Sequence, residues 1–190
     1  ASVALIEAEA NPGYHSTGRS AAFWVECYGG PAVQPLTTAS GPFLAAPPAD
    51  FHVGPLMHKR GALHIGTVND KTMADNMRAE FAASSVQIDV SDRAAVAARV
   101  PGLRSEWTHG LWEPDCCDID VAALHAAYLR QAKRQGAALH CNSRLHASTW
   151  RNGVWQIAAG GLNCTAKIII NAAGAWADDV AQMAQVNLPS

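Results

Sequence analysis

The residues best suited to bind a ligand follow two apolar segments of the chain. Glu7 closes the apolar run 3–6, and a carboxylate at the end of a buried strand is the group that holds ribose hydroxyls in dinucleotide-binding folds. Asn171-Ala172-Ala173-Gly174 follows the apolar run 168–170, and small residues there let a ligand approach the backbone closely. Two ordinary explanations stay open: a surface Glu that ends a strand, and close packing of a strand on a helix.

A polar segment at 16–20 offers a second kind of chemistry. Ser16, Thr17 and Ser20 contribute hydroxyl groups, Arg19 contributes a guanidinium, and the backbone contributes N–H groups. These are the groups that bind a pyrophosphate. A polar loop that leads into a helix explains the same residues, and the sequence leaves both interpretations open.

Acidic residues gather in the segment 113–120, which contains Glu113, Asp115, Asp118 and Asp120. A pair of carboxylates could serve acid–base chemistry or bind a hard cation. We favour a simpler interpretation, in which Asp120 caps a helix and the others are solvated. No G-x-S-x-G motif and no nucleophile with an evident base occurs, so we assign no catalytic residue.

The five cysteines and eight histidines are scattered along the chain. An odd number of dispersed cysteines does not fit a disulfide framework. No CxxC or HExxH spacing is present, and these are the spacings that typify zinc ligation. We therefore expect free, mostly buried thiols in a reducing compartment, the cytoplasm. The histidines are expected to be surface or packed residues, and no metal site is predicted.

Turn residues and apolar periodicity predict the elements that position these groups. Residues 3–6 and 167–171 are expected to be buried strands of one parallel sheet. The segment 31–46 has helical length, but Pro35 and Gly41-Pro42 should kink or break it. Between 62 and 112 we expect a strand at 62–65, a helix capped by Asp70 with Met73, Met77 and Phe81 on one face, a short helix from Ser91 that ends before Pro101, and a strand at 107–112. A helix capped by Asp120 is expected at 121–135. After it we expect strands at 138–141, 145–150 and 154–158, with a hairpin turn at Asn152-Gly153, and a last helix at about 175–186.

Composition excludes several classes of function. The 190 residues are 49% hydrophobic and 16% charged, which is typical of a globular chain with a core. The net charge of -2 gives no basic field for nucleic acid or an anionic membrane. No apolar stretch is long enough to span a bilayer, and no signal segment opens the chain. It opens instead on a buried strand, and we expect the natural start to lie upstream of Ala1.

Two motifs together carry a family resemblance. GYHSTGRSAA at 13–22 and NAAGAWAD at 171–178 resemble the family of D-amino-acid oxidases, glycine and sarcosine oxidases and D-amino-acid dehydrogenases. The resemblance covers essentially the whole chain. Within the family, residues 6–51 look most like bacterial D-arginine dehydrogenases. Those relatives carry a His where this chain has Phe23 and an acidic residue near Ala62, so neither position can contact a cationic substrate in the same way.

The resemblance implies an α/β fold that is truncated at both ends. Residues 1–30 and 116–190 would form a partial FAD-binding Rossmann-type domain, and residues 31–115 would be part of an inserted α+β substrate domain. The glycine-rich phosphate loop of the family would precede Ala1. The part of the family fold that supplies an arginine for the substrate carboxylate would follow the last residue.

The resemblance also implies roles for individual residues. Glu7 would bind the adenosine ribose, Leu145 would meet the adenine edge, and Phe23 and Tyr28 would lie on the substrate side of the flavin. The full set of expected FAD-binding residues is Glu7, Ala8, Ser16, Thr17, Gly18, Arg19, Ser20, Ala21, Ala22, Leu145, Ala172, Ala173 and Gly174.

The function implied is FAD-dependent oxidation of an amino acid or secondary amine to an imino product, with the flavin taking the hydride. The expected partner is therefore a small amino-acid or amine substrate, and the chain by itself is expected to be inactive. The alternative is a degenerate, non-catalytic relative that acts as a binding or assembly module. Such a module would self-associate through an exposed sheet edge.

Overall fold

The chain folds as two units, described for residues 2–186 by a computed structural model. The terminal unit comprises the described parts of Ala1–Arg19 and Leu129–Ser190, and the central unit is Ser20–Tyr128. The helix α5 (Val121–Arg134) begins in the central unit and ends in the terminal unit. The cofactor-binding and substrate-binding roles predicted for 1–30 with 116–190 and for 31–115 stay predictions.

A short parallel ladder opens the terminal unit. Strand β1 (Ala4–Ile6) pairs in parallel with β8 (Ala138–His140), so that Ala4 lies opposite Ala138. The pairing continues beyond β1, because the Glu7 N–H donates to the His140 carbonyl at 2.8 Å. The strand therefore ends with Glu7 fixed at its carboxyl end.

An antiparallel meander follows, made of β9 (Leu145–Arg151), β10 (Val154–Ala159) and β11 (Leu162–Ala166). The predicted turn at Asn152-Gly153 is confirmed, since both residues have positive φ angles, of 51° and 78°. Such a pair of angles matches a two-residue turn to the twist of its strands. The rings of Trp150 and Trp155 then pack across the hairpin at 5.4 Å between centroids.

The predicted buried strand at 167–171 is wrong. Residues 168–171 form no strand, and among residues 2–186 no strand pairs with them. Ile168 and Ile170 are 76% and 85% exposed. The physical reason is that an apolar run becomes a buried strand only when neighbours pair with it and cover it. The described partner of β1 is β8, and the described chain supplies none for 168–171.

Two helical elements follow this segment. The 3-10 helix η3 (Gly174–Trp176) leads directly into α6 (Ala177–Met183). The predicted helix at about 175–186 is therefore present but ends earlier, at Met183. The terminal unit also holds α1 (Ser16–Arg19), a single helical turn in the loop after β1.

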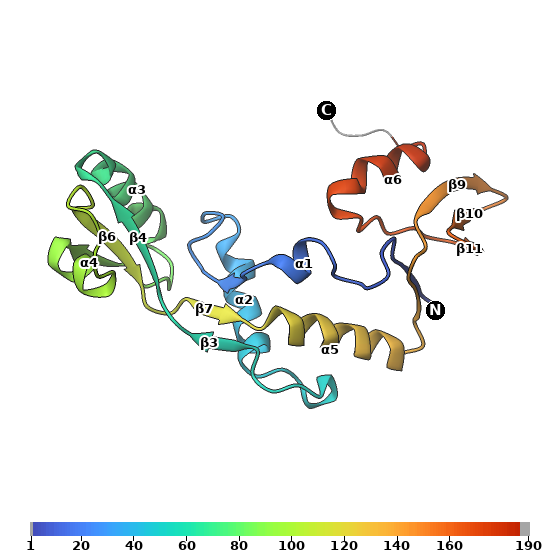
Figure 1. The fold of residues 1–190 in the computed structure, drawn as a ribbon, viewed down its shortest axis with the longest axis horizontal. Coiled ribbons are helices and arrows are strands. Elements are labelled where there is room, and N and C mark those ends of the chain that lie inside the picture. The colour runs from blue at the N-terminus through green and yellow to red at the C-terminus, as the bar shows by residue number, and fades with distance from the viewer. Residues whose placement is uncertain (1, 187–190) are drawn as a thin grey trace. The chain divides into compact units, whose positions relative to one another are not determined.

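Two three-stranded antiparallel sheets form the central unit (Figure 1). In the first, β7 (Cys117–Ile119) lies between β2 (Phe23–Trp24) and β3 (Met57–Lys59). In the second, β6 (His109–Glu113) lies between β4 (Ala62–Gly66) and β5 (Asp89–Asp92). The strand predicted at 62–65 is confirmed, and the strand predicted at 107–112 begins two residues later.

The helix α2 (Gln34–Ala45) runs through the predicted break. Pro35 lies in the first turn, where its missing N–H has no intrahelical acceptor to lose. Pro42 lies inside the helix, yet the helix continues because Gly41 and Leu44 are buried. A Cβ at Gly41 would come within 3.0 Å of the Trp24 ring, so this face packs closely. The packing of this face thus outweighs the tendency of Pro42 to break a helix. The short η1 (Ala49–Phe51) follows.

The other helix starts differ in detail from their predictions. Asp120 caps α5 as predicted, accepting from the Ala123 N–H at 2.8 Å. The helix α4 (Arg93–Arg99) is capped by Asp92, the last residue of β5, instead of Ser91, because the Asp92 carboxylate accepts from the Ala95 N–H at 2.8 Å. The helix α3 (Lys71–Phe81) buries Phe81, whereas Met73 is exposed. The predicted methionine stripe is therefore only partly a core face.

The carboxylate of Asp70 does not cap α3. It accepts hydrogen bonds from the backbone N–H and hydroxyl of Thr67, at 2.8 and 2.7 Å, and closes a capping box on η2 (Val68–Asp70). Hydrogen bonds from the Thr67 side chain and backbone lower the pKa of Asp70.

Asp70 therefore predicts a pH-dependent stability. A depressed folded-state pKa stabilises the protein above the ordinary value of 3.8, and this stabilisation is lost as pH falls through the folded pKa. We expect Asp70→Asn to unfold more easily than wild type at pH 7, and the difference to shrink in acid. Thermal unfolding between pH 7 and pH 3 measures it, with Asp75→Asn in α3 as the control. A difference that persists unchanged at pH 3 contradicts the assignment.

Gly61 allows the turn between β3 and β4. Its φ is +78°, and an added Cβ would lie 2.0 Å from the Trp112 ring. Gly102 has a similar φ of +82°, but a Cβ there meets nothing within 4 Å. Comparing substitutions at the two glycines therefore distinguishes the effect of backbone strain from the effect of steric crowding.

We expect Gly102→Ala to destabilise the fold by about 1 kcal/mol through strain alone. Gly61→Ala should cost about 1–3 kcal/mol more, because the indole ring must move. Chemical denaturation of both variants tests this, and equal losses for the two would show that Trp112 does not crowd Gly61.

Candidate functional site

Glu7, the carboxylate predicted to bind a ribose, lies at the end of β1. It follows a parallel strand and is half-buried. One carboxylate oxygen, Oε1, accepts from the Glu9 N–H at 2.8 Å. Within residues 2–186, the other oxygen has no hydrogen-bond partner. The ribose-binding role of Glu7 stays a prediction.

A cluster of four side chains surrounds the loop after β1, and we call it the Glu9 cluster. Glu9 Oε1 lies 3.0 Å from His15 Nε2 and 3.9 Å from Arg144 Nη2. Trp176 packs on both partners, with centroids 4.6 Å apart for the His15 ring and the Arg144 guanidinium 6.0 Å from the indole. In the chain, His15 and Arg144 directly precede the predicted residues 16–19 and Leu145, and Trp176 follows the predicted segment 172–174 by two residues.

Two donors of the segment 16–19 are bonded to carbonyls of the loop that precedes it. The Gly18 N–H donates to the Gly13 carbonyl at 2.7 Å, and a Cβ at residue 18 would lie 2.3 Å from that oxygen. Only glycine therefore fits at this position without a backbone shift. Arg19 donates to the Tyr14 carbonyl at 3.1 Å, and its guanidinium lies 4.9 Å from the Tyr14 ring centroid.

The segment 171–174 is shaped by one asparagine. The Asn171 side chain accepts from the Ala173 N–H at 3.2 Å and donates to the Ala177 carbonyl at 2.8 Å. Gly174 has a φ of +57°, and a Cβ placed on it would meet nothing within 4 Å. The backbone at Gly174 therefore faces open space, as a close approach by a ligand requires.

The remaining predicted residues lie in the central unit. The Ala22 carbonyl accepts from Ile119 N–H at 2.9 Å, which holds the end of the segment 20–22 to β7. Phe23 is exposed, and the Arg60 guanidinium lies 4.8 Å from its ring centroid. Tyr28 is exposed as well.

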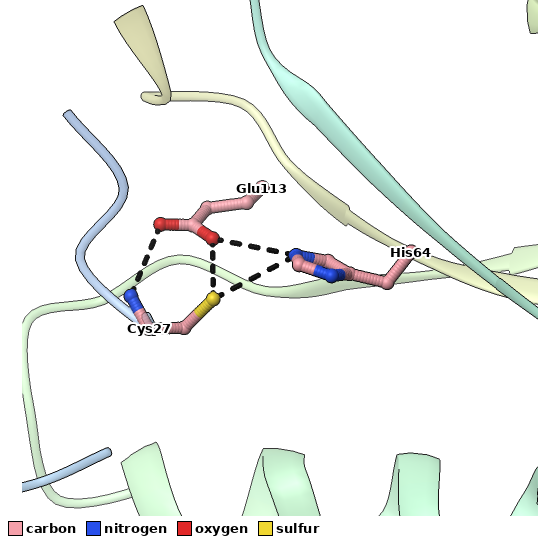
Figure 2. A group of neighbouring side chains, drawn as sticks. All are labelled: Cys27, His64 and Glu113. Carbon is pink, nitrogen blue, oxygen red and sulfur yellow. Dashed lines mark hydrogen bonds and ion pairs between the residues drawn. The ribbon is translucent and has the colours of Figure 1, made fainter. Parts of the chain in front are cut away.

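Three side chains meet at a site that the sequence did not predict: Cys27, His64 and Glu113. Figure 2 shows them converging from the loop after β2, from β4 and from β6. The Cys27 thiol donates to Glu113 Oε2 at 2.7 Å. His64 Nε2 lies 3.6 Å from the sulfur and 3.7 Å from the same oxygen. We call these three residues the Cys27 site.

Backbone donors hold the carboxylate of this site. Glu113 is only 2% exposed, and its Oε1 accepts from the N–H groups of Glu26 and Cys27 at 2.9 and 3.4 Å. Burial would raise the pKa of Glu113, but hydrogen bonds from His64, Cys27 and the backbone outweigh it and lower the pKa. Burial, together with the hydrogen bond and charge of Glu113, raises the pKa of the Cys27 thiol far above its ordinary value. At neutral pH the pair is a thiol and a carboxylate.

The solvated interpretation of the acidic cluster is wrong for Glu113 and confirmed for its neighbours. Asp115 pairs with Lys59 at 2.8 Å and Asp118 with Arg60 at 3.0 Å, both in exposed positions. Glu113 is buried because it ends a central strand and points to the face that packs on the Cys27 loop. Sequence gave no signal of this contact, since Cys27 and Glu113 are far apart in the chain.

Comparison with known proteins identifies the family. A sequence model described as "FAD dependent oxidoreductase" (DAO) matches residues 1–190. The chain belongs to this family.

Solved structures share the family fold at low sequence identity. Glycine oxidase from Geobacillus kaustophilus matches with a TM-score of 0.85 and 15% identity, over 98% of this chain and 52% of its own. L-proline dehydrogenase from P. horikoshii matches with a TM-score of 0.82 and 19% identity, over 99% of this chain and 50% of its own. FAD-bound L-alpha-glycerophosphate oxidase from Mycoplasma pneumoniae matches with a TM-score of 0.81 and 15% identity, over 96% of this chain and 50% of its own.

These matches confirm the predicted α/β fold of the FAD-dependent oxidoreductase family. The chain spans about half the length of these solved structures. In the part of the chain that the structure describes, no helix has the length and apolarity to cross a membrane.

The buried carboxylate predicts a large difference between two substitutions. Glu113→Ala leaves the N–H groups of Glu26 and Cys27 buried without an acceptor, and we expect a loss of about 2–4 kcal/mol in unfolding free energy. Glu113→Gln keeps a carbonyl oxygen in the same place, so it should lose clearly less. Urea denaturation of both variants measures the difference. Equal losses would mean that side-chain volume, and not the acceptor, matters at this position.

Proposed function

We propose that the protein containing this chain oxidises an amino acid or a secondary amine with FAD as its cofactor. The observation that carries the proposal is the match of the whole chain to the FAD-dependent oxidoreductase family. Several structurally similar proteins are named for amino acids, including glycine oxidase, L-proline dehydrogenase and the amino acid oxidase NikD. They support the amino-acid substrate class over the glycerophosphate class.

Two features of the described residues support FAD binding at the ribose end. Glu7 offers one free carboxylate oxygen beside a fixed one, and the small residues 172–174 leave open space at Gly174. Residues 16–22 are proposed to run along the pyrophosphate and flavin, and Leu145 to meet the adenine. When bound, FAD supplies the acceptor for the hydride that leaves the substrate carbon. The chain's own residues are proposed to hold the cofactor and to orient it toward the substrate.

Phe23 and Tyr28 are proposed to face the substrate. Phe23 has no polar atom to bind a substrate amine, and the cationic Arg60 lies over its ring. Ala62 offers no carboxylate for a cationic side chain. We therefore propose a neutral or acidic D-amino acid, or a secondary amine, in place of the D-arginine that the nearest resemblance indicates.

A non-catalytic relative that serves as an assembly module is the second candidate. The exposed Ile168 and Ile170 favour it, because uncovered apolar side chains promote association. The two candidates differ in one respect that can be measured: only the oxidoreductase passes electrons from a substrate to a bound flavin.

The test uses the full-length gene product that contains this chain. We expect it to carry a yellow flavin whose absorbance is bleached without oxygen by a neutral D-amino acid or a secondary amine, and less by D-arginine. Glycerol phosphate serves as the comparison substrate. A colourless product that assembles into oligomers supports the second candidate, and bleaching by glycerol phosphate alone overturns the amino-acid proposal.

A matched pair of variants tests Glu7 in the same protein. Glu7→Gln keeps an acceptor for the Glu9 N–H but replaces the free oxygen by an amide, so FAD affinity should fall about tenfold, the loss of about 1.4 kcal/mol. Glu106→Gln, an exposed position in the central unit, should leave it unchanged. Flavin fluorescence during dilution reports both affinities. Unchanged binding by Glu7→Gln would show that this carboxylate does not hold the cofactor.

A further inference from the structure

Cys27, His64 and Glu113 combine three kinds of metal-binding atom at one point. The sulfur, the Nε2 nitrogen and a carboxylate oxygen all lie within 4.8 Å of one another. We infer that they form a binding site for a divalent transition-metal ion such as Zn²⁺. None of the three residues is among the predicted FAD-binding residues, and the proposal does not depend on the proposed reaction.

The geometry is close to that of a tetrahedral site. An ion at about 2.3 Å from sulfur and about 2.0–2.2 Å from nitrogen and oxygen sets its ligand atoms about 3.4–3.6 Å apart. The sulfur–nitrogen and nitrogen–oxygen distances already are 3.6 and 3.7 Å. The sulfur–oxygen distance of 2.7 Å is a hydrogen bond. The metal would replace the proton of that bond, and the two atoms would move apart by about 0.8 Å.

The fold pre-positions the two sheet ligands. Glu113 on β6 lies opposite Ala62 on β4, and His64 is two residues further along β4. Residues two apart on a strand share a face, so the imidazole and carboxylate are diagonal neighbours on one side of the sheet. Cys27 approaches from the loop after β2 (Figure 2). Three separate segments therefore supply the ligands, and metal binding needs only the separation, by about 0.8 Å, of the Cys27 sulfur from the Glu113 oxygen.

Charge and surroundings favour a transition metal over Ca²⁺ or Mg²⁺. A thiolate and an imidazole suit Zn²⁺ or Co²⁺, whereas hard cations prefer oxygen ligands. Binding releases the Cys27 thiol proton to solvent, and the thiolate and carboxylate together balance the two positive charges of the ion. The backbone N–H groups that hold the other Glu113 oxygen would orient this ligand, as outer-shell partners do in metal sites.

Access and coordination number are also suitable. The His64 side chain is 40% exposed, whereas Glu113 is 2% exposed, so an ion can reach the site along the imidazole. Three protein ligands leave a fourth position for water. This is the arrangement of zinc sites that keep an open position, in contrast to closed structural sites with four protein ligands.

The test is a titration of the full-length protein after its metals are removed with a chelator. Calorimetry with Zn²⁺ alone should show one saturable site. Co²⁺ should give ligand-field bands at wavelengths longer than those of flavin absorption, as tetrahedral coordination with sulfur does, and Zn²⁺ should abolish them. Absence of saturable binding by either ion would show that the trio is only a hydrogen-bonded contact.

Two variants and two controls assign the ligands. Loss of an outer-shell partner alone weakens metal binding 10–100-fold, so His64→Gln and Cys27→Ser should weaken it by about a hundredfold or more. His58→Gln and Cys164→Ser remove the same side-chain types elsewhere and should bind like wild type. His64 is partly exposed, so His64→Gln is expected to fold even if Cys27→Ser does not. Wild-type affinity in His64→Gln overturns the proposal.

Discussion

The central unit depends on one buried charge. The Glu113 carboxylate ends the middle strand of the β4-β6-β5 sheet and accepts the N–H groups of Glu26 and Cys27. A buried carboxylate is tolerated only where hydrogen bonds replace the water it loses. The same bonds fix the loop after β2, which follows Phe23-Trp24 and leads to Tyr28. Glu113 thus fixes the backbone next to Tyr28, one of the two residues proposed to face the substrate.

The terminal unit is organised in a different way. Its polar contacts converge on Glu9, where a carboxylate joins an imidazole and a guanidinium that share one indole ring. These contacts are partly exposed, so each contributes little by itself. Their role is to position three segments, because they bring together the loop after β1, the residue before β9 and the 3-10 helix before α6. The segments with a family resemblance meet there without any single strong bond.

The sequence predicted the elements whose signals are local. Asp120 caps α5, and Asn152-Gly153 forms the hairpin, because each effect operates within a few residues. It failed where distant contacts decide. Packing carries α2 through Pro42, and the segment 168–171 lacks the strand pairing that its composition led us to expect. The Cys27 site also depends on distant contacts, since its three side chains come from three separate segments, and the sequence therefore did not predict it.

The parallel pairing of β1 with β8 has a consequence for the order of folding. Ala4 must meet Ala138, and closing so long a loop costs more chain entropy than any other strand pairing among residues 2–186. Prior folding of Ser20–Tyr128 shortens the flexible part of that loop and lowers the cost. The central unit should therefore form first and act as a template. The β1–β8 ladder, with Glu7 at its end, would be among the last parts to be completed.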